Sequence, residues 1–162
     1  MKTFSLRRAS CTAAAACMVG LLSFGFGIHA YVAEAVTVDF VHDTYLTYHG
    51  GDKKPDQSGY LYYNGGVDGY IEFAIPKIEP GDYTAAIVYK THDECGVFQT
   101  YIDGTAVGDP VDQHADNSGD ITKELGTVTI QESDTHTVRL EEQENSYEKY
   151  RITVKSLTLT PG

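Results

Sequence analysis

The chain is organised around an alternation of apolar and polar positions that is clearest between Gly69 and Gly108. Within this stretch, Ile71, Phe73 and Ile75 would face one way, and the residues between them would face the other. A period of two with one apolar face is typical of a β-strand that covers a core.

The same alternation predicts about eight short strands, spaced roughly a dozen residues apart, which is typical of an all-β antiparallel β-sandwich or jelly roll. The ranges of alternating sequence are 36–40, 60–63, 70–75, 83–89, 97–102, 105–107, 124–130, 136–140 and 152–160. The polar stretches 42–58, 91–96, 109–120 and 141–149 are predicted to be loops. Asp103-Gly104 predicts a hairpin, because a type I′ turn needs φ > 0 at both central positions.

The N-terminus predicts a secretory signal peptide at residues 1–35. A basic start precedes an uncharged, apolar run from Ala9 to Ile28. Cleavage is expected after Ala35, which closes a small-x-small pattern, with Ala30 as a second candidate. The alternative is an uncleaved anchor helix, since about 20 apolar residues can span a bilayer. The expected product is one domain, 36–162, secreted or held at the cell surface.

Without residues 1–35, the chain has 127 residues, 9 basic and 22 acidic side chains, and a net charge of −13. This length is sufficient for one core. A surface this acidic repels phosphate backbones and anionic lipid, which argues against nucleic acid and membrane partners. Cys95 is then the single cysteine, so no internal disulfide can form.

Tyr62-Tyr63-Asn64 is a candidate carbohydrate-binding site just before a glycine-rich turn. Flat aromatic rings stack on the apolar faces of sugars, and an amide can both donate to and accept from ring hydroxyls. Tyr147, in a later polar loop, is a candidate for the same reason. The alternative is that one tyrosine of the pair packs in the core and the other covers an edge.

The segment His92-Asp93-Glu94-Cys95 mixes metal-capable and acid-base side chains. His92 and Asp93 are also candidate carbohydrate-binding residues. A zinc site needs three or four converging ligands, and His-x-x-Cys supplies two. A nucleophilic thiol needs a base and a lowered pKa. The simpler interpretation is a solvated loop in which Cys95 packs as a small apolar residue.

Asp112, Asp116 and Asp120 are candidate calcium ligands, because calcium takes several oxygen ligands from a flexible loop. Their spacing does not match an EF-hand loop. The alternative is a solvated acidic loop, in which Asp112 fixes its own turn by accepting hydrogen bonds from backbone amides. No cofactor other than calcium is expected.

A series of motifs between about residues 60 and 161 carries a family resemblance. In chain order they are Gly69-Tyr70-Ile71-Glu72-Phe73, Pro80-Gly81-Asp82-Tyr83, Tyr101-Ile102-Asp103-Gly104, Val107-Gly108-Asp109-Pro110-Val111-Asp112, Leu125-Gly126-Thr127-Val128, His136-Thr137-Val138-Arg139-Leu140 and Leu157-Thr158-Leu159. Their order and spacing resemble the galactose-binding-domain-like β-sandwiches, the jelly rolls of many carbohydrate-binding modules of bacterial glycoside hydrolases.

The resemblance implies a non-catalytic module, often with a structural calcium ion and a sugar site on loops at one end or on a concave sheet face. In this family the last strand commonly reads Asn-x-Asp, where the Asn can bind sugar and the Asp can bind calcium. This chain has Thr153 and Lys155 at those places, and it has no tryptophan. These departures weaken the expected calcium and sugar sites more than they weaken the expected fold.

The sequence lacks a nucleophile elbow, a His-Glu-x-x-His motif and a phosphate-binding loop. Glu141 and Glu142 are adjacent on a predicted strand end, so they would point to opposite faces and not act as an acid-base pair. We therefore predict a secreted, non-catalytic carbohydrate-binding module that binds a glycan or polysaccharide weakly. The alternative is a cell-surface structural or protein-interaction module, with another surface protein as partner, that has lost its sugar site.

Overall fold

The computed structural model describes residues 33–55, 59–132 and 134–162. The chain divides into two units, Met1–Tyr31 and Val32–Gly162, and all the described residues belong to the second. Nearly all of the predicted signal peptide lies outside the described residues, so its cleavage stays a prediction. Within the described ranges, no helix is long and apolar enough to cross a membrane.

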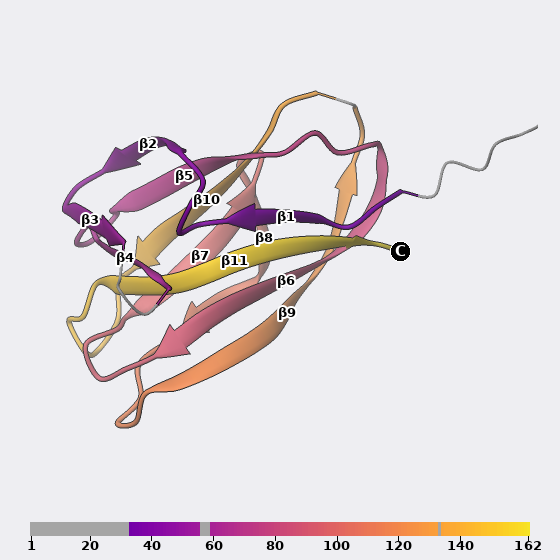
Figure 1. Ribbon diagram of the computed structural model, residues 1–162. Helices are drawn as coiled ribbons and strands as arrows, with labels where there is room; N and C mark the ends of the chain where they lie inside the picture. Colours follow the sequence, from indigo (N-terminus) through magenta and orange to yellow (C-terminus); the bar gives the residue numbers. More distant parts are fainter. Residues whose placement is uncertain (1–32, 56–58, 133) are drawn as a thin grey trace, which may run out of the picture. The chain divides into compact units, whose positions relative to one another are not determined.

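The described part of the chain forms eleven strands. They are β1 (Val36–Asp39), β2 (Tyr45–His49), β3 (Asp52–Pro55), β4 (Leu61–Asn64), β5 (Tyr70–Ile75), β6 (Gly81–Thr91), β7 (Val97–Ile102), β8 (Thr105–Asp112), β9 (Gly119–Ile130), β10 (His136–Gln143) and β11 (Arg151–Pro161). These strands build two antiparallel sheets (Figure 1). The predicted all-β sandwich is therefore confirmed.

The first sheet has the order β3-β4-β11-β6-β9, and the second has the order β2-β5-β10-β7-β8. In the first sheet, β11 is the organising strand, because β6 pairs along one edge while β4 and β1 share the other. β4 pairs with the start of β11, from Arg151 to Val154, and β1 pairs further along, from Ser156 to Leu159 (Figure 1).

The core lies between the inner faces of the two sheets. Phe40 and Ile78 of the core come from connecting segments. The other members come from strands of both sheets: Val38, Leu61, Tyr63, Ile71, Phe73, Ile75, Tyr83, Ala85, Ile87, Tyr89, Phe98, Ile102, Val107, Val111, Leu125, Ile130, Val138, Leu140, Ile152, Val154, Leu157 and Leu159. In β5 the buried and half-buried residues alternate as the sequence predicts. Burying this apolar set contributes roughly 1.5–3 kcal/mol for each large side chain, and offsets the conformational entropy lost on folding.

Three of the predicted loops are shorter than expected. The stretch 42–58 contains β2 and β3, and the stretch 109–120 is cut at both ends because β8 continues to Asp112 and β9 begins at Gly119. β2 is an edge strand in which four of the five residues are exposed, so its sequence carries no apolar alternation. β10 also runs on to Gln143, and it buries Glu142 in what was predicted to be an exposed segment.

The predicted hairpin at Asp103-Gly104 is confirmed. The two residues join β7 to β8 with φ of 49° and 77°, which are the left-handed values that a type I′ turn requires. The Asp103 carboxylate also accepts hydrogen bonds from the backbone N–H of Thr137 at 2.9 Å and from His136 Nδ1 at 2.6 Å. The turn is therefore tied to the start of β10.

Candidate functional site

A cleft of about 740 Å³ opens where β3, β4 and the start of β11 lie side by side. Its lining includes Gly51, Asp52, Tyr62, Tyr63, Asn64 and Arg151. Asn64 is paired with Asp52 on one side and with Arg151 on the other. Residues directly opposite in an antiparallel ladder share a face. An acid, an amide and a guanidinium therefore form one polar row on the outer face of the first sheet.

Tyr62 lies on the same outer face as Asn64, because β4 alternates between buried and solvent-facing residues. The ring of Tyr62 is half-buried, and the Arg151 guanidinium lies over it, 5.7 Å from the ring centroid. The cleft therefore combines one aromatic ring with hydrogen-bonding groups of both kinds, as the sequence predicts for Tyr62 and Asn64. Asp52 and Arg151 were missed, since they approach Asn64 only through strand pairing.

Tyr63 points the other way and belongs to the core. Its side chain is fully buried, and its hydroxyl donates a hydrogen bond to the carbonyl oxygen of His49. A ring buried in this way cannot present a face to a sugar. The tyrosine pair therefore divides as the alternative interpretation states, with one ring in the core and one at the surface.

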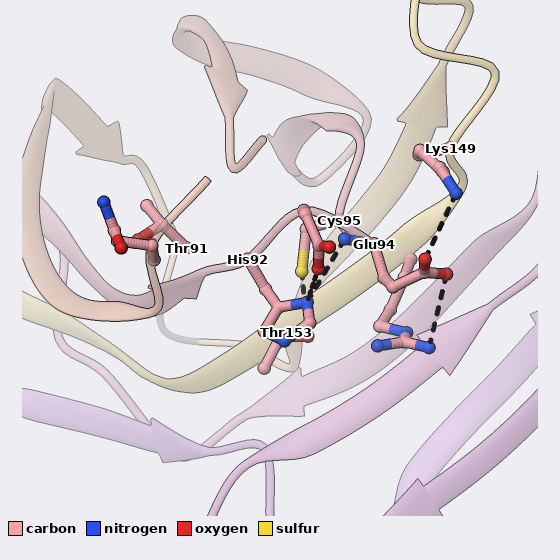
Figure 2. Close-up of polar contacts among 9 residues, drawn as sticks. Thr91, His92, Glu94, Cys95, Lys149 and Thr153 are labelled. Carbon is pink, nitrogen blue, oxygen red and sulfur yellow. Dashed lines mark hydrogen bonds and ion pairs between the residues drawn. The ribbon is translucent and has the colours of Figure 1, made fainter. Parts of the chain in front are cut away.

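Glu94 ties the segment 92–95 to the start of β11. Its carboxylate lies 3.2 Å from Lys149 Nζ (Figure 2). The same carboxylate lies 4.0 Å from Arg151 Nη2. All three side chains are partly exposed, so each ion pair contributes at most about 1 kcal/mol to stability. Their main effect is to place the guanidinium beside the cleft.

A second group of side chains joins Asp112, His114 and Tyr147. One carboxylate oxygen of Asp112 accepts the backbone N–H of His114 at 2.9 Å, and the other accepts the Tyr147 hydroxyl at 3.3 Å. The His114 and Tyr147 rings stack with centroids 3.9 Å apart and 19° between their planes. The negative charge of Asp112 raises the pKa of the Tyr147 hydroxyl. His114 was missed, because a lone histidine in a loop has no sequence pattern.

His92 and Asp93 lie beside this second group and do not line the cleft. The backbone N–H of His92 donates to the carbonyl oxygen of Gln113 at 3.0 Å. His92 Nδ1 is 2.6 Å from Asp93 Oδ1, and both side chains are about half exposed. The predicted carbohydrate-binding residues are therefore distributed between two places, with Tyr62 and Asn64 at the cleft and His92, Asp93 and Tyr147 at the loop end.

Cys95 is fully buried, and its sulfur lies 3.3 Å from the Thr153 hydroxyl oxygen (Figure 2). Burial raises the pKa of the thiol, and the bond to Thr153 opposes this effect only in part. A protonated, enclosed thiol is neither a nucleophile nor a metal ligand. This geometry agrees with the interpretation of Cys95 as a small packed residue.

The predicted calcium ligands do not converge. Among the residues that the structure describes, no three His, Cys, Asp or Glu side chains are placed to hold a metal ion. Asp112 is engaged by His114 and Tyr147, and burial together with the nearby Asp120 raises the pKa of the Tyr60 hydroxyl. Asp112, Asp116 and Asp120 therefore do not form the group of ligands that the sequence predicts, and a bound calcium ion stays an untested prediction.

The fold of this chain is similar to that of several solved structures, although its sequence matches no known family. No family model matches the chain, and no curated protein matches it. Among solved structures, 78% of the chain superposes on a Paenibacillus xanthan lyase with a TM-score of 0.68 and 19% identity, although it spans only 13% of that enzyme.

Two carbohydrate-binding modules share this two-sheet β-sandwich fold along nearly their whole length. The CBM36-1 domain of a multidomain xylanase from the hindgut metagenome of Trinervitermes trinervoides matches with a TM-score of 0.58 and 11% identity, over 80% of this chain and 98% of that domain. A CBM36 module in complex with calcium and xylotriose matches with a TM-score of 0.55 and 8% identity, over 76% of this chain and 98% of the module. At these identities the similarity shows the fold alone. It confirms the predicted galactose-binding-like β-sandwich.

Proposed function

We propose that this protein is a secreted, non-catalytic module that binds a glycan in the cleft formed by β3, β4 and β11. The observation that carries the proposal is the polar row of Asp52, Asn64 and Arg151 next to the outward-facing ring of Tyr62. A sugar offers this combination an apolar face and a set of hydroxyls. An aromatic ring, an amide, a carboxylate and a guanidinium match those groups.

The expected affinity is low. One aromatic ring supplies the stacking surface. Arg151 is partly engaged already, because it lies over the Tyr62 ring and forms an ion pair with Glu94. A cleft open to solvent also leaves part of a bound sugar in water, so its contacts offset less of the cost of association. We expect a Kd nearer 1 mM than 1 μM, or about −4 to −6 kcal/mol.

The solved neighbours support a glycan as the ligand class. One of them was solved with xylotriose bound, and another is a domain of a xylanase. The predicted signal peptide supports an extracellular location, where such polymers occur.

The Glu141–Glu142 pair supports the proposal that the module is non-catalytic. Glu142 is 2% exposed in the sandwich interior, whereas the neighbouring Glu141 lies on the opposite face beside Arg139. A glycosidase needs two carboxyl groups that face the same glycosidic bond. This pair does not meet that requirement.

The experiment is a panel of neutral and acidic polysaccharides in affinity electrophoresis, followed by calorimetric titration with the best oligosaccharide. Tyr62→Ala and Asn64→Ala should each weaken binding about tenfold, equivalent to about 1.4 kcal/mol. Tyr147→Ala is the matched control, because Tyr147 belongs to the other group of side chains. A loss of binding confined to Tyr147→Ala would move the site to the loop end, and no binding across the panel would remove the proposal.

The second candidate function is a protein-interaction module. It is favoured by the exposed apolar side chains Leu46 and Tyr48 on the edge strand β2, and by the exposed Val67 in the turn between β4 and β5. An edge strand with exposed apolar side chains can pair with another chain. A Leu46→Ser/Tyr48→Ser double variant should then abolish partner binding while leaving glycan binding intact.

A further inference from the structure

Glu142 is a buried acid at the end of the sandwich that carries the cleft. It lies on β10 opposite Phe98 of β7, and it is 2% exposed. Its Oε1 accepts the backbone N–H of Gly65 at 3.0 Å, and its own backbone N–H donates to the carbonyl oxygen of Gly69 at 2.8 Å. Glu142 therefore holds both ends of the turn at 65–69, which joins β4 to β5.

The other carboxyl oxygen of Glu142, Oε2, is buried, and no residue that the structure describes hydrogen-bonds it. A buried carboxylate usually has both oxygens hydrogen-bonded, because an unpaired charge in the interior is costly. A protonated carboxyl group does not carry that charge.

The turn at 65–69 is linked directly to the wall of the cleft. Asn64 immediately precedes the turn, and the backbone at Gly50-Gly51 packs so closely on Asn64 and Gly65 that neither glycine could carry a side chain. The hydroxyl of Tyr63 bonds to the carbonyl oxygen of His49 and ties the same two segments together. A displacement of Gly65 would therefore move the part of the wall formed by Asn64 and Gly51.

The surroundings of Glu142 favour its neutral form. Burial raises the pKa of Glu142 to about 8, and the amides of Gly65 and Gly66 oppose this only in part. The titratable group that faces it is the Tyr63 hydroxyl of β4, with Tyr48 of β2 and Tyr70 of β5 acting on that hydroxyl in turn. None of the groups that shift its pKa is a cation. Opposite it on β7 is the uncharged Phe98.

We propose that Glu142 is a positioning residue for the cleft: its protonated carboxyl group holds the turn at 65–69 against Gly50-Gly51, and loss of the proton displaces this wall. Ionisation strengthens the bond to Gly65, but it also places an unpaired charge on Oε2. The desolvation cost is the larger effect, so the ionised group draws water into the turn. The binding-competent cleft is therefore the protonated form.

The direct test is an NMR titration of the backbone amides of Gly65, Gly66 and Gly69 between pH 6 and pH 10. The wild-type shifts should move together with a midpoint near 8. Glu142→Gln, which keeps an acceptor for Gly65 but cannot ionise, should abolish this movement. Glu144→Gln is the matched control, because it removes an exposed carboxylate two residues away and should titrate like the wild type. Wild-type amides that do not titrate would overturn the proposal, even if Glu142→Gln fails to fold.

The binding test rests on the proposed function. About one molecule in eleven keeps the proton one pH unit above the midpoint, so the Kd for the best oligosaccharide should rise about tenfold between pH 7 and pH 9. In Glu142→Gln it should stay constant. An equal Kd at both pH values in the wild type would overturn the proposal. Titrating amides in a protein that binds no glycan would support the role of Glu142 in the turn and count against the glycan function alone.

Discussion

Gln113 and Thr153 exchange two hydrogen bonds in the interior of the first sheet. Gln113 Nε2 donates to the carbonyl oxygen of Thr153 at 2.7 Å, and the Thr153 N–H donates to Gln113 Oε1 at 3.2 Å. Nε2 also donates to the carbonyl oxygen of Lys90 at 3.0 Å. The pairing of β6 with β11 ends one residue earlier, at Tyr89 and Val154. The side-chain amide of Gln113 therefore takes the place of the backbone hydrogen bonds between β6 and β11 at the point where these two strands separate.

Replacing Gln113 with Ala should destabilise the domain strongly. The change removes the partner of two buried backbone groups of Thr153 and of the half-buried carbonyl of Lys90, at a cost of about 1–3 kcal/mol each. We expect a loss of roughly 3–6 kcal/mol in the free energy of unfolding, measured by urea denaturation. Gln143→Ala removes a single, half-buried bond at 3.3 Å and should change little. Equal effects of the two substitutions would show that Gln113 does not hold the strands.

The His136–Asp103 pair should make stability depend on pH. Burial of the imidazole opposes its protonation, but the bonds to Asp103 and to the carbonyl of Glu132 outweigh this and raise the pKa of His136. A raised folded-state pKa stabilises the protein fully below pH 6.5, the unperturbed value, and this contribution disappears as pH rises through the folded-state pKa.

Asp103→Asn tests this pair, because asparagine also accepts the left-handed turn conformation. It should cost about 1 kcal/mol at pH 5.5 and less at pH 8.5, as measured by thermal or urea unfolding. Asp109→Asn, at an exposed position of β8, is the control. A loss that is the same at both pH values would contradict a charged pair.

Glu142 should make the folded protein less stable as pH rises, whereas an acid with a lowered folded-state pKa has the opposite effect. Its folded-state pKa, about 8, lies above the unperturbed value of 4.5, so stability should fall as pH rises from 4.5 to 8. Each unit of difference corresponds to about 1.4 kcal/mol. Glu142→Gln should therefore be the more stable protein at pH 9, whereas Glu144→Gln should follow the wild type. Parallel pH profiles for wild type and Glu142→Gln would exclude a neutral buried acid.

Cys95 should be unreactive until the domain unfolds. The thiol is fully buried and bonded to Thr153, and its raised pKa leaves little thiolate at neutral pH. With a protein of residues 36–162, a coloured disulfide reagent should modify one thiol per chain in denaturant and almost none in native buffer. Rapid native modification would show that the segment 92–95 opens.

Calcium should not raise the melting temperature, because Asp112, Asp116 and Asp120 do not form a ligand cluster. An ion bound only to the folded state would add about 2.7 kcal/mol at a hundredfold excess over Kd, which scanning calorimetry would detect. Magnesium at equal ionic strength is the control. A rise specific to calcium would restore the predicted site.

Predictions that depend on neighbouring residues alone were the ones confirmed. The strand at 70–75 follows from a period of two, and the turn at Asp103-Gly104 follows from backbone preferences of the two residues themselves. The stretch 42–58 shows the limit of this reasoning. β2 and β3 gain their hydrogen bonds from β5 and β4, and no local apolar pattern reveals that pairing.

Some residues of the candidate site could be predicted from the sequence, and others could not. Tyr62 and Asn64 could be named from their side-chain chemistry, but which tyrosine of the pair is buried depends on which face of β4 meets the core. Arg151 and Asp52 lie beside Asn64 only because their strands, β11 and β3, pair with β4. Glu142 looks like any acid in a charged segment until β10 places it inside the sandwich.

The amino-acid order by itself therefore determined that this chain forms stacked antiparallel sheets with hairpin turns, because alternation and turn preferences act between close neighbours. Only the tertiary structure decided which polar side chains meet. A ladder brings together residues that are far apart in sequence, and burial changes the charge state of a group such as Glu142 without changing its identity.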